Sequence, residues 1–324
     1  MRCGRSAGSS RPGAFRGTLH LLPPDDLGAY VASAGAQESW RDPAWLRYFE
    51  LTEAEVEAII RAVATVLSDR PMTRAHLADA VAWSLKKPAL AEKLRTGWGT
   101  YLGPAARHGH LVFGPSEGRN VTFVKPAAWL GRPFGRSARR TEAAAGQALA
   151  GLIDRYLVTF PGASRHMIRR WWGAQRAGLI NDAIARLADE VARVEVDGVR
   201  ALVRAGDADA VAGAKPFRGV RLLPGFDPFT NELPRRVECV LPVALHDRVY
   251  RTAGWITPVV LVDGRVAGTW EIGPAKRGAV EVVPFGRWRG GARQELAVEV
   301  ERIAAFLDRP LAVAWSTPLQ VSGW

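Results

Sequence analysis

Cysteine is almost absent from this chain, and its scarcity excludes several classes of protein. The 324 residues contain only Cys3 and Cys239, which is too few for a disulfide framework or for a zinc site built on cysteine. No apolar run approaches the roughly 20 residues that a membrane-spanning helix needs. The first twenty residues are rich in Arg, Gly and Ser and lack the apolar stretch of a secretory signal. We therefore expect a cytoplasmic protein with no membrane partner.

Lysine is also scarce, with 6 Lys against 38 Arg, yet the formal net charge is +12. The excess is uneven. Residues 1–60 carry 6 basic and 8 acidic side chains, residues 61–140 carry 14 and 4, and residues 141–324 carry 24 and 20. One stretch of the chain thus holds most of the positive charge, which indicates a polyanionic partner such as DNA. A basic face that is merely solvated is the alternative.

Residues 41–124 have the pattern of a winged helix-turn-helix. Thr52 and Glu55 have capping-box spacing ahead of an apolar stripe at helical spacing. Gly and Pro residues then separate two short runs of strand-forming residues, which is typical of a hairpin. The elements expected are helices over residues 52–68, from Thr73, and over 88–108, followed by strands over 110–113 and 120–124.

The same order recurs in residues 141–205, with little sequence shared between the two copies. Ser164 is expected to cap a short helix that Gly173 ends, and Asn181 or Asp182 is expected to cap the next one. The hairpin is marked by an Asp-Gly turn. The elements expected are helices over residues 141–158, 164–172 and from about 181, and strands over 191–196 and 199–203, around Asp197-Gly198.

The remaining segments differ from these two in composition and in their pattern of apolar residues. Residues 125–140 contain two Pro, two Gly and five basic residues, which predicts a basic linker. A strand is expected over residues 15–22, and Asp25 is expected to cap a short helix. Residues 216–324 predict a β-rich C-terminal domain with one late helix. Its expected elements are strands over 220–223, 237–243, 258–262, 265–271 and 280–283, a tight turn at Asp263-Gly264, and a helix over 293–308. The fold class predicted is α+β, with tandem winged helix-turn-helix units followed by a β-rich part.

Two glycine-containing motifs resemble catalytic or cofactor sites. Residues 114–118 match Gly-x-Ser-x-Gly, but a nucleophile elbow needs a helix after the serine, and a strand is expected here. A wing loop is therefore the favoured interpretation. Gly97, Gly99 and Gly103 are one residue off the dinucleotide fingerprint and lack a strand-helix-strand context. We expect no cofactor.

His108 and His110 could ligate a metal, but no Cys, Asp or Glu stands beside them in the sequence. A structural role is favoured, and no metal site is predicted. The adjacent Trp171 and Trp172 could stack on bases, although neighbouring indoles at a helix end are more often core residues.

Several cations fall on elements that face the duplex in a helix-turn-helix, namely the second helix, the third helical stretch and the wing. The second copy adds two arginines at the end of its short helix; there, a solvated helix face is the alternative. The predicted DNA-binding residues are Arg74, Lys86, Lys87, Lys93, Arg95, Arg107, Arg119, Arg169 and Arg170.

Four segments carry a resemblance to a known family. They read Phe-Arg-Gly-Thr-Leu-His at residues 15–20, a segment over 97–114 that ends Gly-His-Leu-Val-Phe-Gly, Leu-Leu-Pro-Gly-Phe-Asp-Pro at 222–228, and Gly-Trp-Ile-Thr-Pro at 254–258 followed by Asp-Gly-Arg-Val-Ala-Gly-Thr-Trp at 263–270. Together they resemble the bacterial winged-helix DNA-binding family that includes the crosslink-repair DNA glycosylases. The resemblance implies tandem winged helices and a β-rich C-terminal part.

The chain departs from the family's catalytic pattern. Active members carry a Gln-aliphatic-Gln or Gln-aliphatic-Asp motif upstream of the segment at residues 15–20. Only fourteen residues precede Phe15, and the glutamines form no such pair; they are Gln37, Gln147, Gln175, Gln294 and Gln320. We therefore interpret residues 1–40 as the remnant of a first winged-helix unit, from a truncated chain or a member without the chemistry. His20 and Asp227 are candidate catalytic residues, with structural roles as the alternatives.

The function predicted is a monomeric, winged-helix DNA-binding protein that docks on double-stranded DNA, associates with the nucleoid when bound and lacks the catalytic glutamines. Two alternatives remain. One is an active glycosylase that excises alkylated or crosslinked purines, and the other is a scaffold that uses winged helices to bind proteins. Replacing Lys86, Lys87 and Lys93 by Ala is expected to lower duplex affinity and to flatten its salt dependence.

Overall fold

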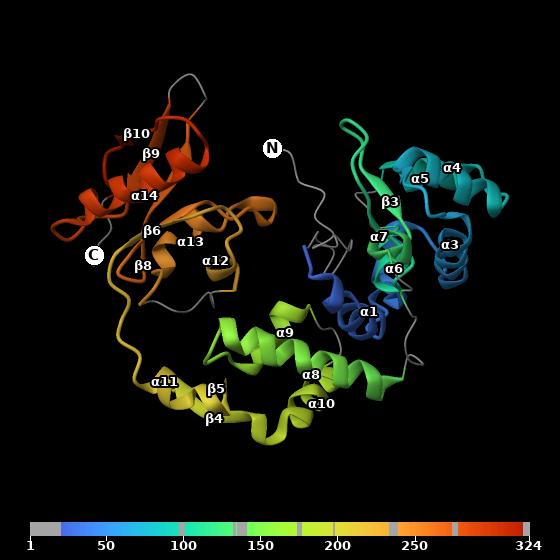
Figure 1. Ribbon diagram of the computed structural model, residues 1–324, viewed down its shortest axis with the longest axis horizontal. Helices are drawn as coiled ribbons and strands as arrows, with labels where there is room; N and C mark the ends of the chain where they lie inside the picture. Colours follow the sequence, from blue (N-terminus) through green and yellow to red (C-terminus); the bar gives the residue numbers. More distant parts are fainter. Residues whose placement is uncertain are drawn as a thin grey trace. The chain divides into compact units, whose positions relative to one another are not determined.

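A computed structural model gives the structure of the protein as two compact units, residues 1–208 and 209–324, each of which is described by itself (Figure 1). It describes residues 21–96, 101–131, 134, 141–173, 177–196, 198–232, 239–273 and 278–319. The segment at residues 15–20, with its expected strand and His20, lies outside this set, as do Gly97, Gly99 and Asp197. Within the described residues, no helix combines the length and the apolar character needed to cross a bilayer.

The expected order of helices followed by a hairpin is present in residues 43–124 of unit 1. Thr52 and Glu55 form the predicted capping box, in which each side chain bonds the other residue's backbone N–H. β1 pairs antiparallel with β3, and β3 pairs with β2, so the strand order is β1-β3-β2. The elements are α2 (Pro43–Phe49), α3 (Glu53–Val66), β1 (Met72–Thr73), α4 (Arg74–Ser84), α5 (Ala89–Thr96), α6 (Gly103–Arg107), β2 (Val112–Phe113) and β3 (Thr122–Val124).

The second pattern has the same topology. Ala163, just ahead of α9, bridges to Leu202 of β5, and β5 pairs with β4 over six residues. This isolated bridge takes the place that β1 has in the first segment, beside the returning strand of a hairpin. Ser164 caps α9, and Gly173 ends it with a φ of 67°, both as predicted. The elements are α8 (Glu142–Thr159), α9 (Arg165–Trp172), α10 (Ala177–Leu187), β4 (Val191–Val196) and β5 (Val199–Arg204).

One predicted cap in this segment is wrong. Asn181 and Asp182 lie inside α10 rather than at its start. The apolar stripe of α10 begins at Leu179 and Ile180, both buried, and continues at Ala183, Ile184 and Leu187. Because that stripe keeps helical spacing through the two polar residues, packing of the stripe outweighs the capping preference of Asn and Asp.

The short helix expected after Asp25 is present, and a helix also occurs where a linker was expected. Residues 27–35 form α1 (Leu27–Gly35), which packs against α8 and α6. Asp25 lies within the 3-10 turn ahead of α1 and not at its N-cap, so the predicted cap is wrong; Pro23 and Asp26 hold the two cap positions. Within the segment interpreted as a linker, Pro126 starts a short helix, α7 (Pro126–Leu130), since proline suits the first helical position.

Unit 2 is built on a five-stranded sheet with the order β10-β9-β8-β7-β6. All pairs are antiparallel except β9 and β10. The predicted strand over residues 237–243 is wrong where the structure describes it: residues 239–242 form turns, and a 3-10 turn follows at Val243–Leu245. Pro242 has no N–H to donate to a strand ladder. The elements are α11 (Ala208–Ala212), β6 (Val220–Leu223), α12 (Pro228–Glu232), α13 (His246–Val249), β7 (Val259–Val262), β8 (Arg265–Ile272), β9 (Ala279–Pro284), α14 (Ala292–Phe306) and β10 (Ala312–Trp315).

The sheet is buried on both faces, which explains why β7 is apolar throughout. Val260 and Val262 pack with Leu296 of α14 on one face. Val259 and Leu261 belong to a separate apolar cluster on the other face, together with residues of α13. Successive strand side chains point to opposite faces, so a continuous run of Val and Leu serves both layers.

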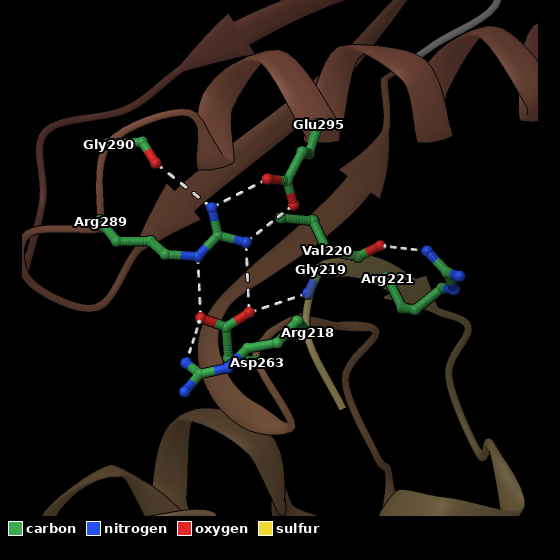
Figure 2. Close-up of polar contacts among 8 residues, drawn as sticks. All are labelled: Arg218, Gly219, Val220, Arg221, Asp263, Arg289, Gly290 and Glu295. Carbon is green, nitrogen blue, oxygen red and sulfur yellow. Dashed lines mark hydrogen bonds and ion pairs between the residues drawn. The ribbon is translucent and has the colours of Figure 1, made fainter. Parts of the chain in front are cut away.

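Arg289 joins the tip of the β7–β8 hairpin to α14 (Figure 2). Its guanidinium donates to both carboxylate oxygens of Asp263, at 2.8 and 3.1 Å, and to Glu295 at 2.8 Å. The backbone N–H of Gly219 also donates to Asp263, at 2.8 Å. These hydrogen bonds lower the pKa of Asp263 to about 2, and the bond from Arg289 has the largest effect. The predicted turn at Asp263-Gly264 is thereby tied to the helix.

Candidate nucleic-acid interface

Helix α4 lies beside the wing of the first segment. The register Thr73↔Thr122 joins the residue before α4 to the returning strand of the hairpin. Arg74 is the first residue of α4, and Lys86 follows its last turn with a φ of 54°. Eleven helical residues rise by roughly 16 Å, so these two cations mark the two ends of the helix. Lys86 is exposed and has no ion pair with another described residue.

The wing is the loop between β2 and β3. Glu117 and Asn120 bridge across it, and Arg119 is exposed near its tip. Ser116 of the Gly-x-Ser-x-Gly motif lies in this loop, with a strand on either side and no helix after it. That geometry is a hairpin and not a nucleophile elbow. Arg119, like Lys86, has no carboxylate partner among the residues that the structure describes.

Three of the other predicted cations are ion-paired. The Lys87 ammonium lies 2.7 Å from Glu55, Lys93 lies 3.1 Å from Glu50, and Arg95 pairs with Asp79. The hydrogen bond from Lys87, with those from Thr52, lowers the pKa of Glu55 to about 2. Ion pairs this exposed contribute about 0–1 kcal/mol to stability, so a DNA phosphate can replace the carboxylate. Breaking the ion pair, however, reduces the free energy gained on binding DNA.

Arg107 has a different environment. Its side chain is half-buried and donates to the Ser39 hydroxyl, and burial lowers the pKa of its guanidinium. Its carbonyl oxygen would lie 3.1 Å from a Cβ at Gly35, so α6 and α1 approach closely here. This side chain packs in the interior of unit 1 and is therefore not part of the proposed DNA-binding surface.

The histidines beside Arg107 lie near each other in unit 1. The rings of His108 and His110 lie 6.2 Å apart, and His108 is buried. Over the part of the chain that the structure describes, no group of three or more His, Cys, Asp or Glu side chains could hold an ion. The structural role favoured for both histidines stays a prediction.

Helix α9 carries three arginines and two adjacent indoles. Trp172 is buried and Trp171 packs against the same core, as predicted for core residues. Arg169 is exposed and has no ion pair with a described residue, whereas Arg170 is half-buried. Arg165, which was not predicted, donates to Asn181 at 2.9 Å. A count of basic residues per helix would have identified it.

Of the two candidate catalytic residues, only Asp227 is described. Its carboxylate accepts from the Phe229 N–H at 2.8 Å, and its carbonyl accepts from Thr230 and Asn231. These are the bonds of a helix cap at the start of α12. They explain an Asp at this position without any reaction.

Comparisons with known proteins agree on one family. The family model described as DNA glycosylase AlkZ-like matches residues 11–306. An interstrand DNA cross-link repair glycosylase of Streptomyces sahachiroi is 35% identical over 269 residues, which cover 80% of this chain and 69% of that protein. The solved structure of Streptomyces sahachiroi DNA glycosylase AlkZ matches with a TM-score of 0.86 at 30% identity, over 96% of this chain and 82% of that one. With its family segments, its repeated helix-and-hairpin topology and these matches, the chain belongs to the AlkZ-like DNA glycosylase family.

Proposed function

We propose that this protein binds double-stranded DNA as a monomer through the two winged-helix segments of unit 1. The observation that carries the proposal is the exposed cations on the elements that a winged helix turns toward DNA: Lys86 after α4, Arg119 on the wing and Arg169 on α9. In such a motif one helix enters the major groove while the wing contacts the backbone. Each cation that neutralises a phosphate releases a counterion.

The relative's printed name places it in crosslink repair, so alkylated or crosslinked purines are the lesions we propose for this chain. An alkylated purine is cationic and already a good leaving group, so an enzyme mainly has to expose the nucleotide and position a water. A glutamine pair would serve that positioning, and none of the five glutamines here has a partner at such spacing. We therefore propose that lesion binding persists while base release is slow.

Two measurements test this function together. Fluorescence anisotropy with a duplex at several salt concentrations is expected to give affinity that falls steeply and log-linearly with salt. Release of 7-methylguanine from alkylated DNA is expected to be little above the background without protein. Salt-independent or absent binding would favour the scaffold interpretation. Rapid base release would instead establish the active glycosylase, and would show that residues other than a glutamine pair position the water.

A further inference from the structure

Two large aromatic side chains in unit 2 are exposed and touch each other. Phe226 is 50% exposed and Trp255 is 60% exposed. Their ring centroids lie 5.1 Å apart at an interplanar angle of 81°. An edge-to-face pair leaves the outer face of at least one ring uncovered by its partner. The pair therefore offers an exposed aromatic ring face to solvent.

The backbone holds this pair in place at a conformational cost. Phe226 has a φ of 60°, a left-handed conformation that a bulky side chain rarely adopts. It occupies the third position of a turn closed by a bond from the Asp227 N–H to the Pro224 carbonyl, where glycine would be unstrained. Glycine stands instead at residue 225, because a Cβ there would lie 2.9 Å from the Ile256 carbonyl oxygen. Strain at an exposed aromatic residue is typical of functional surfaces.

The second loop is equally fixed, and it is basic. The Arg251 N–H donates to the Trp255 carbonyl at 2.8 Å, and Tyr250 bridges to Ile256. Arg251 lies in this loop and Arg248 in the preceding helix α13, and both are exposed; neither is in an ion pair found among the described residues. Exposed aromatic rings among arginines form the combination that binds single-stranded nucleic acid, since rings stack on bases while cations meet phosphates.

We propose that Phe226 and Trp255 form a stacking platform for an unpaired nucleobase, and that Arg248 and Arg251 contact its flanking phosphates. The inference rests on the proposed binding of DNA and extends it to unit 2. The ligand is a base that has left the duplex stack, as at a bulge or a lesion, because a stacked base has no free face to offer. Chemically, the platform recognises the π-face and not the hydrogen-bonding edge, so we expect little preference among the four bases.

The test compares two duplexes that differ by one unpaired 2-aminopurine, whose fluorescence falls when it stacks. The variant is Phe226→Ala with Trp255→Ala, and Trp255→Phe alone is the conservative variant. Phe306→Ala is the matched control, because Phe306 is 73% exposed on α14 and has no ring contact with a described residue. Affinity is measured at several salt concentrations for each protein and each duplex.

The wild type is expected to prefer the bulged duplex and to quench the probe. The double variant should lose on the order of ten-fold in affinity for that duplex, lose the quenching, and keep the slope of affinity against salt. Trp255→Phe should retain most of both, and Phe306→Ala should change neither. Equal losses on both duplexes, or quenching that persists in the double variant, would overturn the platform and leave duplex binding intact. A wild type that binds neither duplex would overturn the proposed function as well.

Discussion

The two helix-and-hairpin segments of unit 1, residues 43–124 and 141–204, share an order of elements but differ in how their cations are paired. In the first, Lys87, Lys93 and Arg95 lie against carboxylates of neighbouring elements. In the second, the eight residues of α9 include three arginines and a histidine and no acidic residue. In the stretch with the largest net charge in the sequence, carboxylates thus already occupy several of the cations. Net charge counts residues, whereas DNA meets only cations that carboxylates leave available.

The largest effect is expected from removing cations without ion pairs in both segments at once. Lys86→Ala, Arg119→Ala and Arg169→Ala together should lower duplex affinity on the order of 100-fold at moderate salt, because three phosphate contacts are lost. The slope of log affinity against log salt should fall by roughly 2.7, at about 0.9 for each contact. Anisotropy over a salt series measures both quantities. An unchanged slope would show that these three cations do not contact phosphates.

A matched triple variant of the paired cations should have a smaller effect. Lys87→Ala, Lys93→Ala and Arg95→Ala remove the same charge, but each of these side chains already has a carboxylate partner. We expect a loss of affinity of several-fold and a slope change of less than half that of the first variant, since part of each phosphate interaction is offset by the ion pair it breaks. Equal losses in the two triple variants would show that pairing does not matter here.

Removing the carboxylate of one ion pair, and not its cation, also tests whether pairing limits DNA binding. Glu55→Gln keeps a side chain that completes the capping box but removes the partner of Lys87. Duplex affinity should rise by two- to three-fold, and the free energy of unfolding should fall by about 0.2–1 kcal/mol. Thermal melting and anisotropy at neutral pH check the two expectations. A fall in affinity would mean that Lys87 is held in a productive position by Glu55.

The stability difference between this variant and the wild type should depend on pH. The pKa of Glu55 is about 2 in the folded protein and is higher in the unfolded chain, near 4.3. The carboxylate therefore contributes its full stabilisation above the unfolded pKa and loses it as the pH falls toward 2. Wild type and Glu55→Gln should differ in melting temperature at pH 6 and converge near pH 2. A constant difference across that range would place the effect in the cap and not in the ion pair.

Local sequence signals predicted most of the fold, because each rests on a bond between near neighbours. The capping box at Thr52, the caps at Ser164 and Gly173 and the turn at Asp263-Gly264 all occur as expected. The failures are tertiary. The local sequence predicts Asn181 as a helix cap, but burial of the apolar stripe of α10 places it inside the helix. Strand β10 is defined by its parallel pairing with β9, and it was not among the expected strands.

For the candidate site, too, local features could be predicted from the sequence and contacts between distant residues could not. Which elements carry cations could be read from the chain, but which cations are paired could not, because Lys87 and Glu55 are 32 residues apart. The aromatic pair was also missed. Phe226 and Trp255 lie on two loops, and their exposure follows from strained and bonded turns that have no periodicity. Hydrophobic residues in loops are commonly expected to be buried, so only the structure shows that these two are not.

The smallest effect is expected where a neutral group holds a cation in the second segment. Arg165 donates to the Asn181 side chain at 2.9 Å, and both residues are exposed. Asn181→Ala should free Arg165 without removing an opposing charge, so duplex affinity should change by less than about two-fold and the salt slope should not change. Alanine is also the better helix former within α10, so stability should hold or rise slightly. Anisotropy and thermal melting measure both. The contrary result would be that Asn181→Ala raises duplex affinity as much as Glu55→Gln does. In that case the cations of both segments would bind DNA less tightly because their side chains are restrained, and not because carboxylates neutralise them.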